Sequence, residues 1–360
     1  MYTNKMVDGL RGFAKSIAFR FRCVQLRADD EGSVPVTRRR IQDRNNPVEL
    51  YNDCQFHRRY RFSKQTVMRL MELLSFERSE TNRGLPVPPL LQLLAALRFY
   101  GAGTFQVVTG DLAEVSQPTA SRIIRKVSSL IAGRLYATFV RFPTDTACVM
   151  RRFHQIAGFP GVSGCIDCTH IVIKSPGGDD AEVYRNRKTI FSLNVQVISG
   201  PQLEFFDVVA SWPGSTHDSR IFENSRACYR YEQGEVHGTL LGDSGYPCLP
   251  FLMTPLASPR TQPEVAYNKA HTSTRNSVER AFGVWKRRFP CLTMKLQTKV
   301  ETTALIITAC AVLHNVGRVM HDRCPPGPRY VPQDYSFHCA QHDSHIGHAV
   351  RAALIDRTFR

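Results

Sequence analysis

Four acidic residues stand where a carboxylate could do chemistry. Asp167 lies within a run of β-branched residues, and Asp243 follows a short apolar run. Asp218 opens a helical stretch, and Glu279 borders the apolar face of another. Carboxylates that share a cleft raise one another's pKa unless divalent cations neutralise them, and magnesium prefers such hard oxygen ligands. The four acids therefore predict a metal site, of the kind in which two ions about 3.5–4 Å apart assist phosphodiester cleavage.

Each acid also has an ordinary structural explanation, which the sequence leaves open. Asp167 could accept hydrogen bonds from the backbone, and Asp218 could cap its helix. Asp243 could be a turn residue, and Glu279 could belong to an exposed i,i+4 ion pair. A buried strand cannot easily hold an unpaired carboxylate, because removing its charge from water is costly. The sequence therefore predicts that a cation or a hydrogen-bond donor faces Asp167.

Basic residues surround Glu279 on a helix predicted over 273–289. They are Arg275, Arg280, Lys286, Arg287 and Arg288. Cations beside an acid suit a phosphate backbone that passes over a metal site, so Arg280, Lys286 and Arg287 are candidates for DNA contact. The whole chain has 47 Lys and Arg against 31 Asp and Glu, a net charge of +16 over 360 residues. This balance favours a polyanionic partner such as nucleic acid, and the alternative is a solvated basic surface.

Four runs with strand-like composition position the first acids. They are 161–174, 192–199, 203–212 and 239–242. The short link between the second and third runs predicts an antiparallel meander. A helix from Ser215 precedes the fourth run, and helices over 273–289 and 302–320 follow it. Three strands, a helix, a strand and then helices is the order of an α/β ribonuclease H-like mixed sheet flanked by helices.

The stretch before the strands is helical and contains a helix-turn-helix-like segment. A short helix over 111–115, a turn at Ser116-Gln117 and Pro118 at the first position of the next helix make up this pattern. The candidates for DNA contact on that helix are Arg122, Arg125 and Lys126. An ordinary helical hairpin with a solvated polar face is the alternative.

Cysteine usage and hydropathy bear on the compartment. Eleven cysteines without paired spacing favour reduced thiols in the cytosol or nucleus. Cys165 and Cys168 form a C-x-x-C, for which zinc is an alternative, but no second pair lies at zinc-ribbon spacing. The uncharged run 302–316 is too short to span a bilayer, so we expect a buried helix and no membrane.

Six motifs follow one another along the chain. They are Gly161-Val-Ser-Gly-Cys-Ile-Asp-Cys-Thr-His, Asn186-Arg-Lys, Trp212-Pro-Gly-Ser-Thr-His-Asp-Ser, Leu241-Gly-Asp-Ser-Gly-Tyr, Arg275-Asn-Ser-Val-Glu-Arg-Ala-Phe-Gly and Leu313-His-Asn. In this order they resemble the motifs of the Harbinger transposase-derived nucleases, which are DDE-type endonucleases. The resemblance covers residues 50–320 and implies a ribonuclease H-like fold.

The resemblance also implies roles for the acids. Asp167, Asp243 and Glu279 would be the catalytic triad, and Asp218 would join them in holding a divalent cation, magnesium or manganese. The second motif adds Arg187 and Lys188 to the candidates for DNA contact. Relatives work with a separate Myb-like DNA-binding protein, which implies such a partner, and a distribution between nucleus and cytoplasm. A homo-oligomer is a further expectation.

Together these patterns predict a metal-dependent DNA endonuclease in four segments. They are a basic, disordered tail over 1–46, a helical DNA-binding region over 47–145, a catalytic domain over 146–320 and a C-terminal tail with a short helix over 321–360. One alternative is a domesticated scaffold that keeps the fold and binds DNA without cutting it. Another is a nuclease directed at RNA.

Overall fold

The structure is a computed structural model of the chain that describes residues 46–76, 87–103, 115–324 and 344–360. Asp53–Arg360 form one compact unit, and the residues up to Asn52 belong to another. The described helix of that smaller unit is α2 (Pro47–Leu50), which the Asn46 side chain caps. The tail predicted over 1–46 lies, apart from Asn46, outside the described residues.

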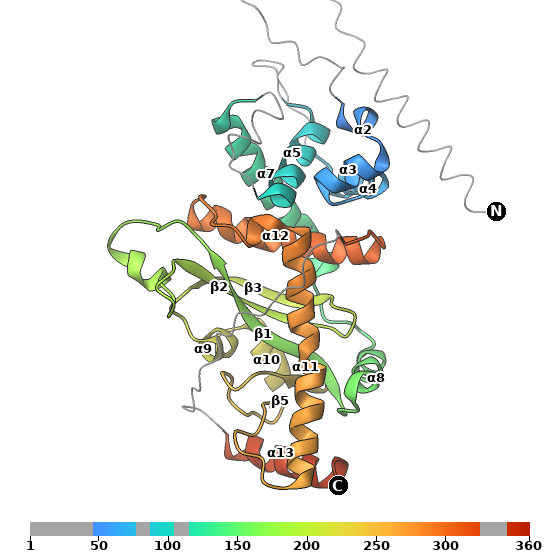
Figure 1. Cartoon of the computed structure of the whole chain (residues 1–360), viewed down its shortest axis with the longest axis vertical. Coiled ribbons are helices and arrows are strands. Elements are labelled where there is room, and N and C mark those ends of the chain that lie inside the picture. Colours follow the sequence, from blue (N-terminus) through green and yellow to red (C-terminus); the bar gives the residue numbers. More distant parts are fainter. Residues whose placement is uncertain (1–45, 77–86, 104–114, 325–343) are drawn as a thin grey trace, which may run out of the picture. The chain divides into compact units, whose positions relative to one another are not determined.

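A five-stranded mixed sheet forms the centre of the larger unit (Figure 1), in the order β3-β2-β1-β4-β5. The strands are β1 (Val162–Val172), β2 (Ser192–Ser199), β3 (Phe205–Pro213), β4 (Thr239–Leu241) and β5 (Leu252–Met253). The first three pair antiparallel, so the predicted meander is confirmed. β4 pairs parallel with β1, and β5 with β4. This mixed sheet with flanking helices is compatible with a ribonuclease H-like fold.

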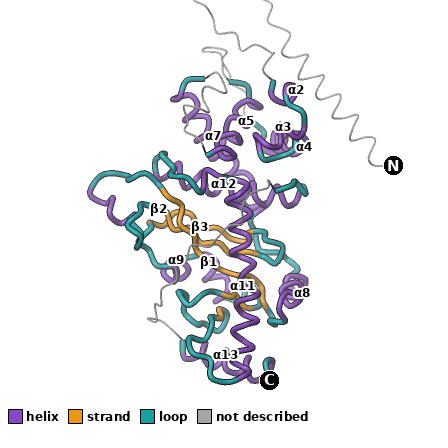
Figure 2. The backbone as a smooth tube through the Cα atoms, viewed as in Figure 1, coloured by secondary structure: helices purple, strands orange, loops and turns teal. Residues whose placement is uncertain are grey.

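Helices cover the sheet and continue beyond it. In chain order they are α3 (Asp53–Tyr60), α4 (Lys64–Leu74), α5 (Pro89–Ala102), α7 (Gln117–Phe139), α8 (Thr146–Ala157), α9 (Asp218–Glu223), α10 (Arg226–Glu232), α11 (Gln262–Arg288), α12 (Val300–Val319) and α13 (His345–Thr358). α11 runs across the sheet and contacts β1, β2 and β4 (Figure 2). α12 packs along α7 and β3. A single helix therefore reaches the three strands that carry or adjoin the acids.

Several parts of this arrangement, α10 among them, were not predicted. α8 was missed, although Asp145 caps it and Val149 and Phe153 are buried four residues apart. α11 begins eleven residues before the predicted start, where Thr261 and Glu264 form a reciprocal capping box. β5 has two residues, too few for an alternating pattern to be recognised.

The helix-turn-helix prediction is supported in its second helix alone. Pro118 lies in the first turn of α7, as predicted, and the apolar face of that helix is buried. The first helix, predicted over 111–115, lies almost wholly outside the described residues. A helix-turn-helix domain is therefore not confirmed. The prediction that the residues before β1 are helical is confirmed for those that the structure describes.

α12 is long and apolar enough to cross a membrane, with a mean hydropathy of 1.4. However, 72% of that segment is buried inside the protein. It also carries two buried polar residues, His314 and Asn315, which hydrogen bond to neighbouring backbone groups. It is therefore a core helix, as the uncharged run 302–316 predicted.

Asn315 fastens α12 to the edge strand β3. Its Oδ1 accepts the Phe205 N–H at 2.9 Å, and its Nδ2 donates to the carbonyl oxygens of Phe139 and Phe205, both at 2.7 Å. The side chain thus satisfies three backbone groups, and a buried polar group left unsatisfied costs about 1–3 kcal/mol. We expect Asn315→Ala to lower the free energy of unfolding by about 3 kcal/mol in urea titrations. The control is Thr308→Ala, which removes one hydroxyl within the same helix; equal losses would contradict this role for Asn315.

Candidate metal centre and its basic surroundings

The parallel pairing of β1 and β4 places two of the predicted acids next to each other. Cys165 on β1 lies opposite Leu241, the last residue of β4. Asp167 lies two residues after Cys165, and Asp243 lies two residues after Leu241. Adjacent parallel strands bring residues at the same offset side by side. Two acids 76 positions apart in sequence therefore adjoin at one edge of the β1–β4 pair.

Asp218 reaches the same region through a residue that sequence analysis missed. It is the first residue of α9, and its Oδ1 accepts a hydrogen bond from Asn194 Nδ2 at 2.8 Å. Asn194 is buried on β2, and its amide also donates to the Thr216 carbonyl oxygen at 2.9 Å. The capping role considered for Asp218 is wrong, because the cap residue of α9 is His217 and no side chain caps this helix. Asn194 is one of four polar residues in β2, so its type and position alone did not single it out.

α11 supplies Glu279 and the cation that faces Asp167. Arg275 Nη1 donates to Asp167 Oδ2 at 2.9 Å, and its Nη2 donates to Glu279 Oε1 at 2.5 Å. Arg275 and Glu279 are one helical turn apart, so a single guanidinium bridges two acids from different elements. The sequence-predicted i,i+4 pair of Glu279 exists, but it is largely buried, with side chains 16% and 24% exposed. Arg275 therefore belongs to the site itself.

Asp167 and Asp243 each accept a local backbone hydrogen bond, as their structural explanations predicted. Asp167 Oδ1 accepts the Cys168 backbone N–H at 2.8 Å, and its other oxygen faces Arg275. Asp243 Oδ1 accepts the Gly245 N–H at 3.0 Å, as a turn residue does. Local backbone bonds thus orient both carboxylates without using all their oxygens.

Electrostatic interactions link three of the acids. Burial raises the pKa of Asp167 well above its usual range; Arg275 opposes this shift, and the charges of Asp243 and Asp218 add to it. Burial also raises the pKa of Asp218 to about 6, with a further contribution from Asp243. Glu279 joins them through Arg275, and the four acids (Asp167, Asp218, Asp243 and Glu279) are named the acid cluster.

The donor chemistry of the acid cluster fits a divalent cation, although its side chains are not arranged around a common point. Within the described residues, no three His, Cys, Asp or Glu side chains converge closely enough to hold a metal ion. The Arg275 guanidinium stands between Asp167 and Glu279 and supplies positive charge there. Carboxylate oxygens are the ligands that magnesium and manganese prefer. Asp167 and Glu279 thus meet through a positively charged group.

The C-x-x-C pair does not form a zinc site. Residues three apart in a strand point to opposite faces, and the two thiols have different partners. Cys165 Sγ lies 3.6 Å from the Thr274 carbonyl oxygen, and Cys168 Sγ lies 3.3 Å from the Tyr246 hydroxyl. Burial raises the pKa of Cys165 to about 12, which keeps this thiol protonated.

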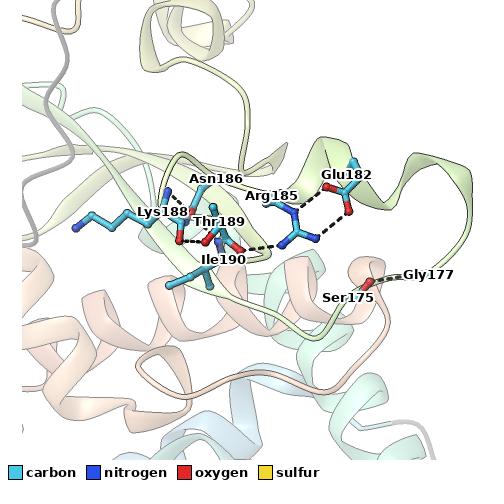
Figure 3. Close-up of polar contacts among 8 residues, drawn as sticks. All are labelled: Ser175, Gly177, Glu182, Arg185, Asn186, Lys188, Thr189 and Ile190. Carbon is cyan, nitrogen blue, oxygen red and sulfur yellow. Dashed lines mark hydrogen bonds and ion pairs between the residues drawn. The ribbon is translucent and has the colours of Figure 1, made fainter.

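The loop that carries Arg187 and Lys188 borders Asp218. Asn186 Oδ1 accepts the backbone N–H groups of Lys188 and Ile190, and this fixes the turn before β2. Figure 3 shows the Lys188 side chain extending away from this loop. Arg187 Nη2 lies 2.7 Å from His217 Nδ1, next to Asp218 in sequence. Two exposed cations therefore lie on the Asp218 side of the acid cluster.

The other candidates for DNA contact divide into three groups. Arg280 is exposed and Arg287 half-buried on α11. Lys286 is 8% exposed, and its Nζ donates to Thr169 Oγ1 on β1 at 2.7 Å. Lys286 therefore faces the sheet and not the solvent, and this burial lowers its pKa to about 8. The remaining candidates, Arg122, Arg125 and Lys126, are exposed on α7.

Comparison with known proteins identifies the family. Residues 166–315 match the family described as DDE superfamily endonuclease, a range that includes all four acids. The chain is 38% identical over 265 residues to the Homo sapiens protein named "Putative nuclease HARBI1", which covers 71% of this chain and 75% of that one. The chain belongs to the Harbinger transposase-derived nucleases. The Mus musculus protein of the same name is 38% identical over 287 residues, or 76% and 82% of the two chains. The Arabidopsis thaliana protein named "Protein ALP1-like" is 29% identical over 263 residues, or 68% and 64%.

Membership of this family confirms the resemblance found in the six motifs. The matched family is one of endonucleases, so a nuclease-like activity on phosphodiester bonds is the function that the relatives support. The matched range runs from within β1 through most of α12, and thus contains the sheet except for the first four residues of β1.

Asp218 allows a test of how much the buried negative charge of the acid cluster destabilises the folded protein. Its pKa is raised to about 6 from 3.8, so the folded protein binds more protons than the unfolded chain between those pH values. Stability should therefore fall as pH rises from about 4 to 6 and stay low above it. We expect Asp218→Asn, which still accepts from Asn194, to be more stable than the native protein by about 2–3 kcal/mol at pH 7 in EDTA. Urea titrations at pH 4 and pH 7 measure this; a difference that does not change with pH would contradict the assignment.

Proposed function

We propose that this Harbinger-type chain is a DNA endonuclease that depends on a divalent cation, magnesium or manganese. The observation that carries the proposal is the register of β1 and β4, which sets Asp167 beside Asp243 while α11 brings Glu279 to the same edge. Acids from three separate elements, in a strongly basic chain, match the requirements of phosphodiester hydrolysis better than any structural need of the sheet.

Asp167, Asp243 and Glu279 are the residues we assign to catalysis, and Asp218 joins them as a metal ligand. The bound cations would activate the attacking water and stabilise the departing 3′ oxygen. The chain contributes preorganised oxygens: Cys168 and Gly245 fix one oxygen of Asp167 and Asp243, respectively. Asn194 holds Asp218 in the same way. These donors engage one oxygen of each acid; to bind a common cation the side chains would have to converge, with Asp167 giving up its bond to Arg275.

Cations on two sides of the acid cluster would bind the DNA backbone. Arg187 and Lys188 lie on the Asp218 side, and Arg280 and Arg287 lie on α11 with Glu279. Phosphate contacts of this kind position the duplex and carry no sequence information. Arg122, Arg125 and Lys126 on α7 are proposed as additional contacts.

The test is cleavage of supercoiled plasmid by the native protein with magnesium or manganese, against the same reaction in EDTA. Nicked or linear product that appears with the metals and is absent in EDTA supports the proposal. Tight, salt-sensitive DNA binding without any product would indicate a scaffold that keeps the fold without cutting. Preferential cleavage of RNA over DNA in a competition would replace the proposed substrate.

The family resemblance supports three further proposals, on partner, location and oligomeric state. We propose a separate Myb-like DNA-binding protein as partner, with the nuclease distributed between cytoplasm and nucleus, and action as a homo-oligomer. Purification of the tagged chain from cells, with sizing of the complex by light scattering, tests the partner and the oligomer together. A monomer without any copurifying DNA-binding protein would contradict both.

A further inference from the structure

A large cavity lies among the helices of the larger unit and plays no part in the acid cluster. Its volume is about 1550 Å³, above the roughly 300–1,000 Å³ of typical small-molecule pockets. It is lined by α3, the start of α4, the end of α5 and the residues that follow α12. We name it the basic cavity for its six cationic side chains, Arg58, Arg59, Arg61, Lys64, Arg98 and Arg323.

The positive charge of the basic cavity is not balanced by the acids in its lining. Those acids are Asp53 and Asp322, so six cations against two acids leave a formal charge of +4, with histidines neutral. Asp53 pairs with Lys64 at 3.4 Å, and Asp322 Oδ1 accepts the Ser63 backbone N–H at 2.9 Å. The acids are thus engaged away from the arginines.

The arginines also repel one another. Burial lowers the pKa of Arg61 below its ordinary value, and the charges of Arg98 and Arg58 lower it further. Like charges held close together destabilise a folded protein unless an opposite charge lies between them. An anion in the basic cavity would supply that charge.

The fold holds Arg61 in place by specific local means. Arg61 has a φ of 67°, a conformation that costs energy for any residue with a side chain. Its Nε and Nη2 donate to the Gly101 carbonyl oxygen at 3.0 and 2.7 Å. A Cβ at Gly101 would lie 2.8 Å from Arg61 Cγ, so a larger residue would disturb this contact. The basic cavity is therefore a built feature, not a chance grouping of surface side chains.

The lining chemistry indicates phosphate groups. Arginine presents a planar fork of donors that matches a phosphate with two bonds. The lining contains no Phe, Tyr or Trp, so unstacked bases would find no aromatic platform there. The basic cavity would therefore contact only the phosphates of its ligand. Contacts of this kind are typical of a nucleic-acid backbone that is bound without regard to sequence.

α11 connects the basic cavity to the acid cluster. Arg288, in its last turn, donates through Nη2 to the Asp322 carbonyl oxygen at 2.9 Å, beside the cavity. Glu279 lies nine residues earlier, and nine residues of helix span about 14 Å. That distance equals about four base-pair steps of 3.4 Å along one strand of DNA.

We propose that the basic cavity binds the sugar-phosphate backbone of the DNA whose scissile bond lies at the acid cluster. This site would anchor the substrate independently of its sequence, a few base pairs from the cut. The identity of the polyanion as DNA rests on the proposed function; the anion site itself rests on the cavity.

The test is the salt dependence of DNA binding by Arg58→Ala/Arg323→Ala. Both side chains are exposed, so circular dichroism should show an unchanged fold. Anisotropy of a labelled 30-base-pair duplex is measured in EDTA at several KCl concentrations. Two lost phosphate contacts should reduce the slope of log K against log salt by about 1.8, with affinity at least about tenfold lower at 0.1 M salt. The control, Arg260→Ala/Arg357→Ala, removes two exposed arginines outside the cavity.

Equal slopes for the two double variants would overturn the proposal. Polyglutamate that displaces DNA from the native protein but not from Arg58→Ala/Arg323→Ala would assign the cavity to an acidic protein segment, and would also overturn it. Because binding is measured without metal, a changed slope with no plasmid cleavage would remove the nuclease proposal alone. Cleavage with an unchanged slope would remove the cavity proposal alone.

Discussion

Asp243→Asn and Glu279→Gln should each lower metal-dependent DNA cleavage by about a thousandfold or more. Either change replaces a charged oxygen ligand by a neutral amide of the same shape, which weakens the hold on a divalent cation. A bound metal ion contributes several kcal/mol to charge stabilisation in the transition state, and each 1.36 kcal/mol is tenfold in rate. The measurement is the initial rate of plasmid nicking with manganese, under conditions in which the native protein is active.

The controls for this experiment are Asp180→Asn and Glu301→Gln. They make the same chemical changes at exposed positions. Asp180 lies in the short 3-10 helix Asp179–Tyr184, and Glu301 lies in the first turn of α12. Both should cleave at the native rate. Circular dichroism of all four variants tests that the sheet is intact. Native rates in Asp243→Asn and Glu279→Gln would remove the assignment of the acid cluster, whatever the family membership of the chain.

Arg275→Gln should make the protein less stable without metal and should tighten its binding of manganese. The Arg275 guanidinium bridges Asp167 and Glu279, and its side chain is 16% exposed. Loss of one partner from a buried ion pair costs about 3–5 kcal/mol, because the remaining charge has no compensation. A divalent cation can supply that compensation, and without Arg275 less fixed positive charge opposes its entry. Manganese should therefore raise the unfolding temperature more in the variant than in the native protein.

Arg280→Gln is the matched control for this second prediction. Arg280 is exposed and directly follows Glu279 in the sequence. Its replacement by Gln changes the net charge by the same amount as Arg275→Gln. Isothermal titration with manganese and thermal unfolding in EDTA measure the two expected effects without any reference to cleavage. If Arg275→Gln and Arg280→Gln bind manganese equally and unfold at the same temperature, Arg275 does not compete for the site.

Local pattern explains how much of the fold could be predicted. β2 was predicted to the residue, because its ends are marked by a turn and its apolar residues alternate. The position of Asp167 within a strand and of Glu279 on a helix followed from the same periodicities. α8 and the first half of α11 were missed because their start signals were not used, although Asp145 and Thr261 are both side-chain caps.

The sequence by itself determined which elements carry the four acids, since strand and helix periods are properties of neighbouring residues. Only the tertiary structure decided what each side chain faces. Arg275 is a partner of Asp167 from 108 positions away, and Lys286 is buried against β1 although its charge suggested a surface contact. The basic cavity likewise joins residues near positions 58, 98 and 323. Partners of this kind are fixed by strand register and helix packing, which bring distant residues together and leave no trace in local periodicity.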